Sequence, residues 1–217
     1  MRNFERGFVF IVGNMFGSKT SEMIHLLNLE KDMGRNVQAF KMSFDNRYKA
    51  GSLLTHSGMA FPAKQVKSPL HLESLLKKET QVVGIEEVQF FDERIIDFIL
   101  ENKEKYLIIA TALQMDFRGN PFPLRSIRGM EYDSNKHVGH LMPYSKIISR
   151  YPQCTFKENK ETCREEAIYI QRFKESGELA PYNDATIVVG GKDRYAPRCL
   201  EHFVKPIVKK EIVDCLM

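Results

Sequence analysis

The stretch that decides the fold is Phe8-Val9-Phe10-Ile11-Val12-Gly13-Asn14-Met15-Phe16-Gly17-Ser18-Lys19-Thr20. Its first five residues, 8–12, are apolar without interruption and rich in β-formers, which predicts a strand buried on both faces in a parallel sheet. From Thr20 to Met33 apolar residues recur at three- and four-residue spacings, and Gly34 follows as a stop, so an amphipathic helix is expected there. Residues 13–20 therefore join a buried strand to the start of a helix.

Such a loop can bind phosphate groups, because the unpaired amides at the helix start and the helix dipole both face an anion. A lysine in the loop reaches the β- and γ-phosphates and the next hydroxyl holds Mg²⁺, and Lys19 and Thr20 stand in that order. The full pattern has glycine just before the lysine, whereas Gly17 and Ser18 are reversed. If position 18 requires a positive φ, serine costs about 1 kcal/mol there. The alternative is that Gly13 only turns the chain and Lys19 is a solvated residue of the helix.

Strands and helices continue to alternate over roughly the first 145 residues. Short apolar strands are expected at 37–40, 82–85 and 106–110. One helix is expected to begin at Ser68-Pro69, which supply a capping residue and a first-turn proline, and another to cover 95–99. Parallel neighbours need crossover connections, which helices supply, so the fold class is α/β, an open parallel sheet of the P-loop NTPase kind.

The pattern of the chain changes beyond Lys146. The segments 147–148, 167–173 and 186–189 have the composition of short strands separated by polar loops, and no helical pattern continues among them. We therefore expect two domains. A nucleotide-binding domain covers residues 1–150, and a small second domain covers residues 151–217.

Two carboxylates follow the strand expected at 82–85. Glu86 and Glu87 come at its carboxyl end, and in an open α/β sheet this edge is where ligands bind. One carboxylate there can hold Mg²⁺, directly or through water, and the other can accept the proton of an attacking hydroxyl. The alternative is a pair of solvated acids at a strand exit.

Three cysteines and a histidine form a candidate metal site in the second domain: Cys154, Cys163, Cys199 and His202. Three thiolates and an imidazole suit tetrahedral Zn²⁺, and a closed set of four protein ligands is structural rather than catalytic. The spacing Cys199-x-x-His202 is common at zinc sites, whereas eight residues separate Cys154 from Cys163. The alternative is reduced, partly buried cysteines with no metal. The fourth cysteine, Cys215, is assigned no role.

Length and composition exclude several classes of protein. The 217 residues allow one ordinary domain and an appendage, and 43% hydrophobic with 28% charged residues is typical of a globular chain. No apolar stretch approaches the roughly 20 residues of a membrane span, so we expect a cytoplasmic protein with no membrane partner. The net charge of +4 suits anionic ligands, but no basic stripe with interleaved aromatic residues supports binding to nucleic acid.

Several motifs follow one another along most of the chain. They are Gly13-x-Met15-Phe16-(Gly/Ser)₂-Lys19-Thr20, Lys41-x-Ser43-x-Asp45-Asn46-Arg47-Tyr48, Thr55-His56-x-Gly58, Ile85-Glu86-Glu87-Val88-Gln89-Phe90-Phe91, Asp116-Phe117-Arg118-Gly119-x-Pro121-Phe122, Gln171-Arg172-Phe173 and Val189-Gly190-Gly191-x-x-x-Tyr195. Together and in this order they resemble the type II thymidine kinases. The resemblance implies transfer of the γ-phosphate of ATP to the 5′-hydroxyl of thymidine, with ATP as co-substrate, Mg²⁺ and structural Zn²⁺ as cofactors, and a homotetramer.

The resemblance also implies roles for individual residues. Glu87 matches the family's general base and Glu86 its metal-linked acid, which is normally aspartate. The implied catalytic residues are Glu87, Lys19 and Arg47. Those implied to bind ATP or its phosphates are Gly13, Asn14, Met15, Phe16, Gly17, Ser18, Lys19, Thr20, Asp45, Arg47, Glu86 and Gln89, of which Thr20 and Glu86 hold Mg²⁺. Those implied around thymidine are Met15, Phe90, Phe117, Tyr195 and the segment Thr186, Ile187, Val188, Val189 and Gly190, hereafter the lasso, whose backbone wraps the base.

The zinc ligands implied by the resemblance are the same four residues, with one difference in spacing. Two residues usually separate the first two ligands in the family, so 157–162 corresponds to an inserted loop between Cys154 and Cys163. Loop length alone is a weak objection, because the closure entropy grows only logarithmically. A zinc ion there would pin both ends of the lasso-containing segment.

A few positions depart from the family pattern. They are the reversed Gly17 and Ser18, Glu86 in place of aspartate, Gln114 where aspartate is usual, and Ile170 where threonine is usual. Two alternatives to a working thymidine kinase therefore remain open. One is a nucleotide-binding protein on the same scaffold whose phosphoryl transfer is slow or lost, and the other is a P-loop ATPase that acts on nucleic acid.

Overall fold

The computed structural model describes residues 6–43, 51–55, 58–127, 132–159 and 161–208. Its centre is a sheet of six parallel strands in the order β10-β1-β7-β6-β2-β5. The strands are β1 (Gly7–Gly13), β2 (Val37–Met42), β5 (Lys64–Val66), β6 (Val82–Ile85), β7 (Leu107–Leu113) and β10 (Lys146–Arg150). The prediction of an open parallel α/β sheet is confirmed.

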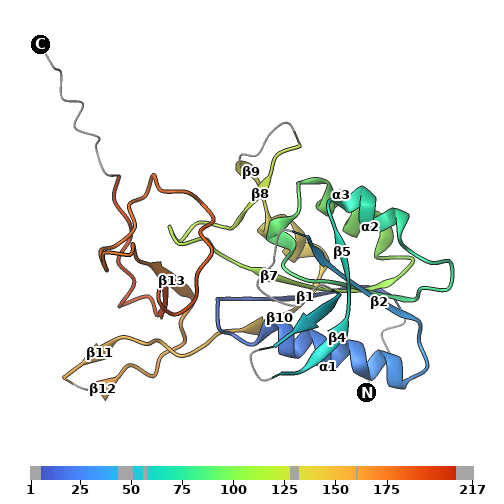
Figure 1. The fold of residues 1–217 in the computed structure, drawn as a ribbon, viewed down its shortest axis with the longest axis horizontal. Helices are drawn as coiled ribbons and strands as arrows, with labels where there is room; N and C mark the ends of the chain where they lie inside the picture. Colours follow the sequence, from blue (N-terminus) through green and yellow to red (C-terminus); the bar gives the residue numbers. More distant parts are fainter. Residues whose placement is uncertain (1–5, 44–50, 56–57, 128–131, 160, 209–217) are drawn as a thin grey trace, which may run out of the picture.

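Both faces of the sheet are covered, because successive side chains of a strand point to opposite sides. On one face, α2 (Pro69–Ser74) and α3 (Arg94–Asn102) share a core with Phe10 of β1, and on the other face α1 (Lys19–Asp32) shares a core with Ile11 (Figure 1). The apolar run of β1 is therefore buried on both sides, as its composition predicts. None of the helices in the described part of the chain is long and apolar enough to cross a membrane.

Two antiparallel pairs and two 3₁₀ helices complete the larger lobe. The pairs are β3 (Ser52–Leu54) with β4 (Ala60–Pro62) and β8 (Pro123–Arg125) with β9 (Tyr132–His137), and the 3₁₀ helices are η1 (Val88–Phe90) and η2 (Val138–Tyr144). The sequence does not predict them. Most of these segments are too short to show a periodicity of their own.

Most of the other predicted elements lie where they are expected. The side chain of Ser68 accepts a hydrogen bond from the amide of His71 at 3.2 Å, so the predicted helix cap is confirmed. The strand expected at 147–148 is β10, which pairs with β1 at the edge of the main sheet. The prediction of a strand at 186–189 is wrong. In the described structure this apolar segment pairs with no strand, because it borders a cavity instead.

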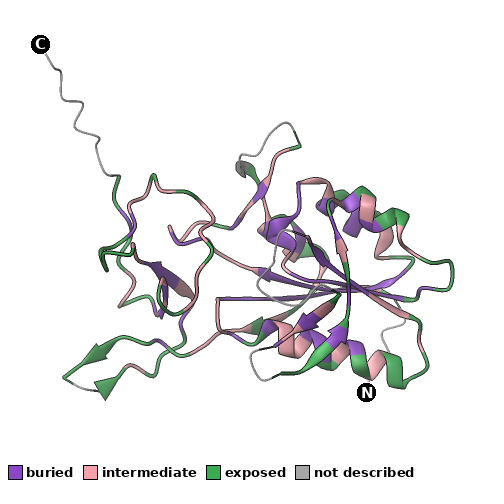
Figure 2. Ribbon diagram, viewed as in Figure 1, coloured by how far each residue is buried: buried purple, intermediate pink, exposed green. Residues whose placement is uncertain are grey.

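A smaller lobe follows β10 and has little regular structure (Figure 1). It contains two antiparallel pairs, β11 (Lys157–Glu158) with β12 (Glu161–Thr162) and β13 (Tyr169–Arg172) with β14 (Tyr195–Arg198). Buried residues are concentrated in the central sheet and are sparse in this lobe (Figure 2). A lobe with so small an apolar core needs another source of stability. The chain leaves the sheet after Arg150, although the division into two domains at this point stays a prediction.

Candidate active site

A cavity of about 480 Å³ lies at the carboxyl ends of β1 and β6, the edge at which open α/β sheets bind ligands. Three parts of the chain that are distant in sequence meet there: residues 13–20, hereafter the phosphate loop, Glu86 and Glu87, hereafter the acidic pair, and the lasso. The residues implied by sequence that line the cavity are Met15, Phe16, Gly17, Ser18, Lys19, Thr20, Glu86, Glu87, Phe90, Phe117, Thr186, Ile187, Val188, Val189, Gly190 and Tyr195.

The phosphate loop packs closely against the end of β10. A Cβ atom on Gly17 would lie 2.1 Å from the main-chain oxygen of Arg150, and one on Gly13 would lie 1.9 Å from the same oxygen, so only glycine fits at these positions. The two neighbours of Gly17, and not Gly17 itself, have the left-handed backbone conformation: φ is 65° at Phe16 and 57° at Ser18. The positive φ considered for position 18 is therefore present. Serine adopts this conformation at a cost of about 1–2 kcal/mol.

Replacing Ser18 by glycine is expected to stabilise the protein. The left-handed backbone costs a serine about 1–2 kcal/mol, and the greater freedom of glycine in the unfolded chain offsets part of this, so the free energy of unfolding should rise by about 0.5–1 kcal/mol. Urea unfolding of Ser18→Gly beside Ser21→Gly measures the difference. Ser21 lies inside α1, where the same exchange should lower stability by about 0.5 kcal/mol. Equal losses in both variants would show that the loop holds no such strain.

Lys19 and Glu87 line the same cavity, so an ammonium and a carboxylate meet there. Lys19 is buried, and its Nζ atom donates a hydrogen bond to the main-chain oxygen of Asn14 at 2.8 Å. Burial lowers the pKa of Lys19 below its ordinary value, although the charges of Glu87 and Glu86 favour the ammonium form. A phosphate group beside Lys19 would favour that form further.

Glu87 is held by β7 in a backbone conformation that residues other than glycine rarely adopt, with φ 54° and ψ 61°. Its amide donates a hydrogen bond to Oγ1 of Thr111 at 2.9 Å. Its carboxylate accepts a hydrogen bond from Nε2 of Gln89, and Oε1 of Gln89 accepts one from the amide of Leu113 at 3.1 Å. Gln89 is fully buried. Both the backbone and the carboxylate of Glu87 are thus tied to the same strand.

Glu86 and Thr20, the pair expected to hold Mg²⁺, are in contact with each other. Oγ1 of Thr20 donates a hydrogen bond to Oε1 of Glu86 at 3.0 Å. Carboxylate and hydroxyl oxygens are ligand types that suit Mg²⁺, which also keeps water ligands and binds substrate phosphates. The longer side chain of Glu86, compared with aspartate, therefore still reaches the hydroxyl of Thr20.

A cluster of apolar side chains lines another part of the cavity. Its members are Phe117, Ile170 and Tyr195, with Met15 and Phe16 packed against them. The hydroxyl of Tyr195 donates a hydrogen bond to the main-chain oxygen of Val188 at 2.6 Å, which ties the lasso to β14. Flat aromatic and thioether surfaces can bury the faces of a nucleobase while main-chain groups bind its edges.

Comparison with known proteins identifies the family. A family model for thymidine kinase matches residues 7–203. The chain belongs to the thymidine kinase family. The thymidine kinases of Mycoplasma capricolum subsp. capricolum and Mesoplasma florum are 32% and 34% identical to it, over 93% and 87% of this chain and 90% and 87% of their own lengths. The ATPase DotB of Legionella pneumophila, a solved structure, is 15% identical over 52% of this chain and 32% of its own, with a TM-score of 0.35. A likeness this low adds nothing to the argument.

Membership of the thymidine kinase family confirms the resemblance carried by the motifs. The chain is an ATP-dependent phosphotransferase that acts on thymidine. The phosphate loop and the acidic pair supply the groups that such a reaction needs, at one edge of one sheet.

Not every residue implied by the resemblance lines the cavity. Gly13, Asn14 and Gln89 are not among the residues that line it. The side-chain amide of Asn14 donates hydrogen bonds to the main-chain oxygens of Ala167, at 3.0 Å, and Tyr169, so it ties the phosphate loop to the smaller lobe. Asp45 and Arg47 lie outside the described residues, and their roles stay predictions.

The cavity also has lining residues to which the sequence analysis assigns no role in binding. They are Ser21, Leu54, Thr55, Leu113, Met115, Asp116, Phe122 and Gly191, together with Ile170, which the analysis singles out only as a departure from the family pattern. Thr55, Asp116, Phe122 and Gly191 belong to the motifs quoted above, so the sequence marks these four residues even though it assigns them no contact. Leu54 carries no such signal, because it lies in a three-residue strand whose pairing is not visible in the sequence.

The four predicted zinc ligands come together in the smaller lobe. Their ligand atoms all lie within 4.8 Å of one another. Sγ of Cys163 is 4.0 Å from Sγ of Cys199, and Nδ1 of His202 is 3.7 Å from Sγ of Cys154 and 3.1 Å from Sγ of Cys199. The insertion between Cys154 and Cys163 forms the β11–β12 hairpin, whose two strands run side by side and so bring its ends together.

Proposed function

We propose that the cavity transfers the γ-phosphate of ATP to the 5′-hydroxyl of thymidine with Glu87 as the general base. The observation that carries this assignment is that Lys19 and Glu87 line one cavity beside the amides of the phosphate loop. Phosphoryl transfer depends mainly on positioning and on neutralising the charge of the transferred group. Lys19 supplies positive charge to the phosphates, and Glu87 orients the hydroxyl and accepts its proton.

The metal and phosphate contacts follow from the same arrangement. Thr20 and Glu86, which already contact each other, hold Mg²⁺, and the ion when bound neutralises the β- and γ-phosphates. Asp45 and Arg47 are proposed, from the family resemblance alone, to lie near these phosphates. Homotetrameric assembly is a further proposal from the same resemblance, and a cytoplasmic location is proposed from the sequence, as expected above.

The thymine ring is proposed to lie against Phe117, Phe90, Met15 and Tyr195, with main-chain groups of the lasso at its edges. Ile170 is buried in this cluster and offers no hydrogen-bonding group from its side chain. Recognition of the polar edges of the base therefore falls to the backbone. The apolar Ile170 is the feature of the pocket most relevant to which pyrimidine it accepts.

The cysteines and the histidine of the smaller lobe are proposed to hold a structural zinc ion, and their chemistry fits one. A cysteine binds zinc as the deprotonated thiolate. Although burial alone raises the pKa of Cys154, hydrogen bonds from the amides of Phe156 and Cys199 and from the side chains of His202 and Cys199 lower it to about 7. With Zn–S bonds of about 2.3 Å, two tetrahedral thiolates lie about 3.8 Å apart, close to the 4.0 Å between Cys163 and Cys199.

A coupled assay of ADP release tests the proposed function. Turnover is measured with thymidine, with deoxyuridine, with no nucleoside, and with single-stranded DNA. Thymidine-dependent ADP release is expected. ATP binding without turnover would support the impaired nucleotide-binding protein, and hydrolysis stimulated by DNA would support the nucleic-acid ATPase. Either result would overturn the proposal.

Replacing Gln89 by methionine is expected to lower kcat by about tenfold, because the general base then loses one hydrogen bond that orients its carboxylate. The KM for ATP should stay within about twofold, since Gln89 does not line the cavity. Steady-state kinetics with each substrate varied in turn measure both quantities. A rise in the KM for ATP with kcat unchanged would instead support the role in phosphate binding that the family resemblance implies.

A further inference from the structure

The lasso lines the nucleoside part of the cavity without belonging to any regular element. It lies in the connection between β13 and β14, which pair with each other and therefore fix the two ends of that connection. A loop with so few apolar contacts has a large conformational entropy to lose, so other groups must hold its shape. Two arginines that have been given no role so far, Arg118 and Arg172, contact the residues just before the lasso and its first residue, Thr186.

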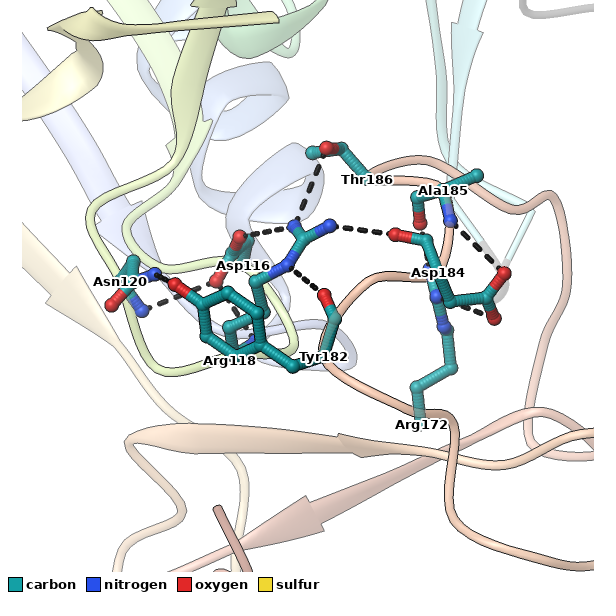
Figure 3. Close-up of polar contacts among 8 residues, drawn as sticks. All are labelled: Asp116, Arg118, Asn120, Arg172, Tyr182, Asp184, Ala185 and Thr186. Carbon is teal, nitrogen blue, oxygen red and sulfur yellow. Dashed lines mark hydrogen bonds and ion pairs between the residues drawn. The ribbon is translucent and has the colours of Figure 1, made fainter. Parts of the chain in front are cut away.

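Arg118 reaches across from the connection that follows β7. Its Nε atom donates a hydrogen bond to the main-chain oxygen of Tyr182 at 2.7 Å, and Nη2 donates one to the main-chain oxygen of Asp184 at 2.6 Å (Figure 3). Nη1 donates to Oδ2 of Asp116 at 2.8 Å and to Oγ1 of Thr186 at 3.3 Å (Figure 3). The Arg118 guanidinium thus connects the larger lobe to Tyr182, Asp184 and Thr186 of the segment that leads into the lasso.

Asp116 keeps the Arg118 guanidinium in place from the other side. Its Oδ1 atom accepts hydrogen bonds from the amides of Arg118 at 2.9 Å and Asn120 at 3.1 Å, which shapes the turn that carries the arginine. The side-chain amide of Asn120 donates to the hydroxyl of Tyr182 at 3.1 Å (Figure 3). The side chain of Asp116 is 3% exposed, so this ion pair is shielded from water and from salt.

Arg172 holds the same segment from β13. Its Nη1 atom donates to the main-chain oxygen of Ala185 at 2.6 Å, and Nη2 forms an ion pair with Oδ2 of Asp184 at 2.8 Å. The guanidinium carbons of Arg172 and Arg118 lie 3.6 and 4.4 Å from the centre of the Phe117 ring. Cation–π contacts of this kind fix the position of the ring. The same two arginines therefore hold Phe117, in the proposed thymine pocket, and the residues just before the lasso.

We propose that Arg118 and Arg172 form a guanidinium clamp that sets the shape of the lasso and so positions it for the nucleoside. The inference rests on the proposed placement of thymidine in the cavity. Arg118 acts through the lasso and is a positioning residue. Only the planar fork of arginine can reach these acceptors at once, because it carries five N–H donors in a rigid arrangement.

The test combines hydrogen–deuterium exchange with kinetics on the full chain. In Arg118→Met without substrates, amide exchange in peptides that cover 182–190 is expected to become about tenfold faster, as the loss of charge-assisted hydrogen bonds requires. The KM for thymidine should rise about tenfold while the KM for ATP stays within about twofold. Asp116→Asn, which retains the shape of the side chain but loses its charge, should move both readouts in the same direction by a smaller factor.

Arg198→Met is the matched control. Arg198 also donates hydrogen bonds to a side chain and a main-chain oxygen, Thr155 Oγ1 at 2.7 Å and Pro197 at 2.9 Å, but none to the lasso. It should leave exchange in 182–190 and both KM values unchanged. Unaltered exchange in that segment for both Arg118→Met and Asp116→Asn would overturn the clamp, and so would an equal rise in the two KM values. A parent protein without thymidine-dependent turnover would instead overturn the proposed function, while the exchange experiment would still decide the clamp.

Discussion

Glu87→Gln is expected to lower kcat for thymidine phosphorylation by about 10²–10⁴-fold, the range that a positioned general base contributes. The amide has nearly the same shape as the carboxylate and can still accept the hydrogen bond from Gln89, so the geometry of the site should survive. The amide cannot accept a proton from the 5′-hydroxyl. The measurement is thymidine-dependent ADP release, with ATP binding followed separately by calorimetry.

Glu101→Gln serves as the control for this variant. Glu101 lies exposed on α3, outside the residues that line the cavity, and the exchange should leave turnover as it is. If Glu87→Gln retained more than about a tenth of the parent kcat, the assignment of Glu87 as the base would be wrong. A loss of ATP binding in this variant would show that the carboxylate serves the phosphates instead.

Loss of the proposed zinc ion is the second change with a large expected effect. Structural zinc sites carry apparent binding free energies of about 10–16 kcal/mol that are coupled to folding, and the apolar cluster beside the four ligands consists of little more than Ala167 and the cysteines themselves. Cys199→Ser should therefore abolish bound zinc and disorder the smaller lobe, which supplies the lasso. Turnover should fall by at least about 100-fold, since the nucleoside pocket is then incomplete.

Metal analysis of the purified parent protein, Cys199→Ser, Cys154→Ser and Cys215→Ser measures this effect. One zinc ion per chain is expected in the parent and in Cys215→Ser, because Cys215 is assigned no role as a ligand. Cys154→Ser should lose the ion like Cys199→Ser, since Sγ of Cys154 belongs to the same cluster and lies 3.7 Å from Nδ1 of His202. A parent protein that holds no zinc would refute the site, and zinc retained by Cys154→Ser would remove that residue from the ligand set.

The sequence predicted the central sheet because its signals are local. The apolar run of β1, the glycine after it and the helical spacing of α1 each occupy a few consecutive residues, and all agree on one strand, loop and helix. The acidic pair was found in the same way, since Glu86 and Glu87 follow a short apolar strand directly. Local agreement of this kind specifies the edge of the sheet at which the site forms.

The conformation of the lasso could not be predicted from its composition. Thr186 to Val189 has the apolar, β-branched character of a strand, yet its place is decided by Tyr195, Arg118 and the cavity that it borders. These contacts depend on how β13 and β14 pair. The lasso has residues that favour a strand, but among the residues that the structure describes no strand lies beside it to pair with. Hydrogen bonds from Tyr195 and Arg118 hold it instead.

The supporting residues of the site were missed for a related reason. Gln89 stands beside the acidic pair and the resemblance assigns it to the phosphates, whereas its hydrogen bonds run to Glu87 and to β7. Arg118 and Tyr182 are 64 positions apart in the chain, and no local pattern relates them. The cysteines were found by residue type, but only the β11–β12 hairpin explains how the distant Cys154 joins Cys163.

The proposed function depends on one cavity that brings a phosphate held by Lys19 to a hydroxyl held by Glu87. A crystal structure with thymidine and a non-hydrolysable ATP analogue tests it most directly. We expect the 5′-oxygen of thymidine within about 3 Å of the Glu87 carboxylate, with Nζ of Lys19 on the terminal phosphates and the base beneath the lasso. Thymidine bound with its 5′-oxygen turned away from Glu87, or phosphates bound outside the loop of residues 13–20, would contradict it.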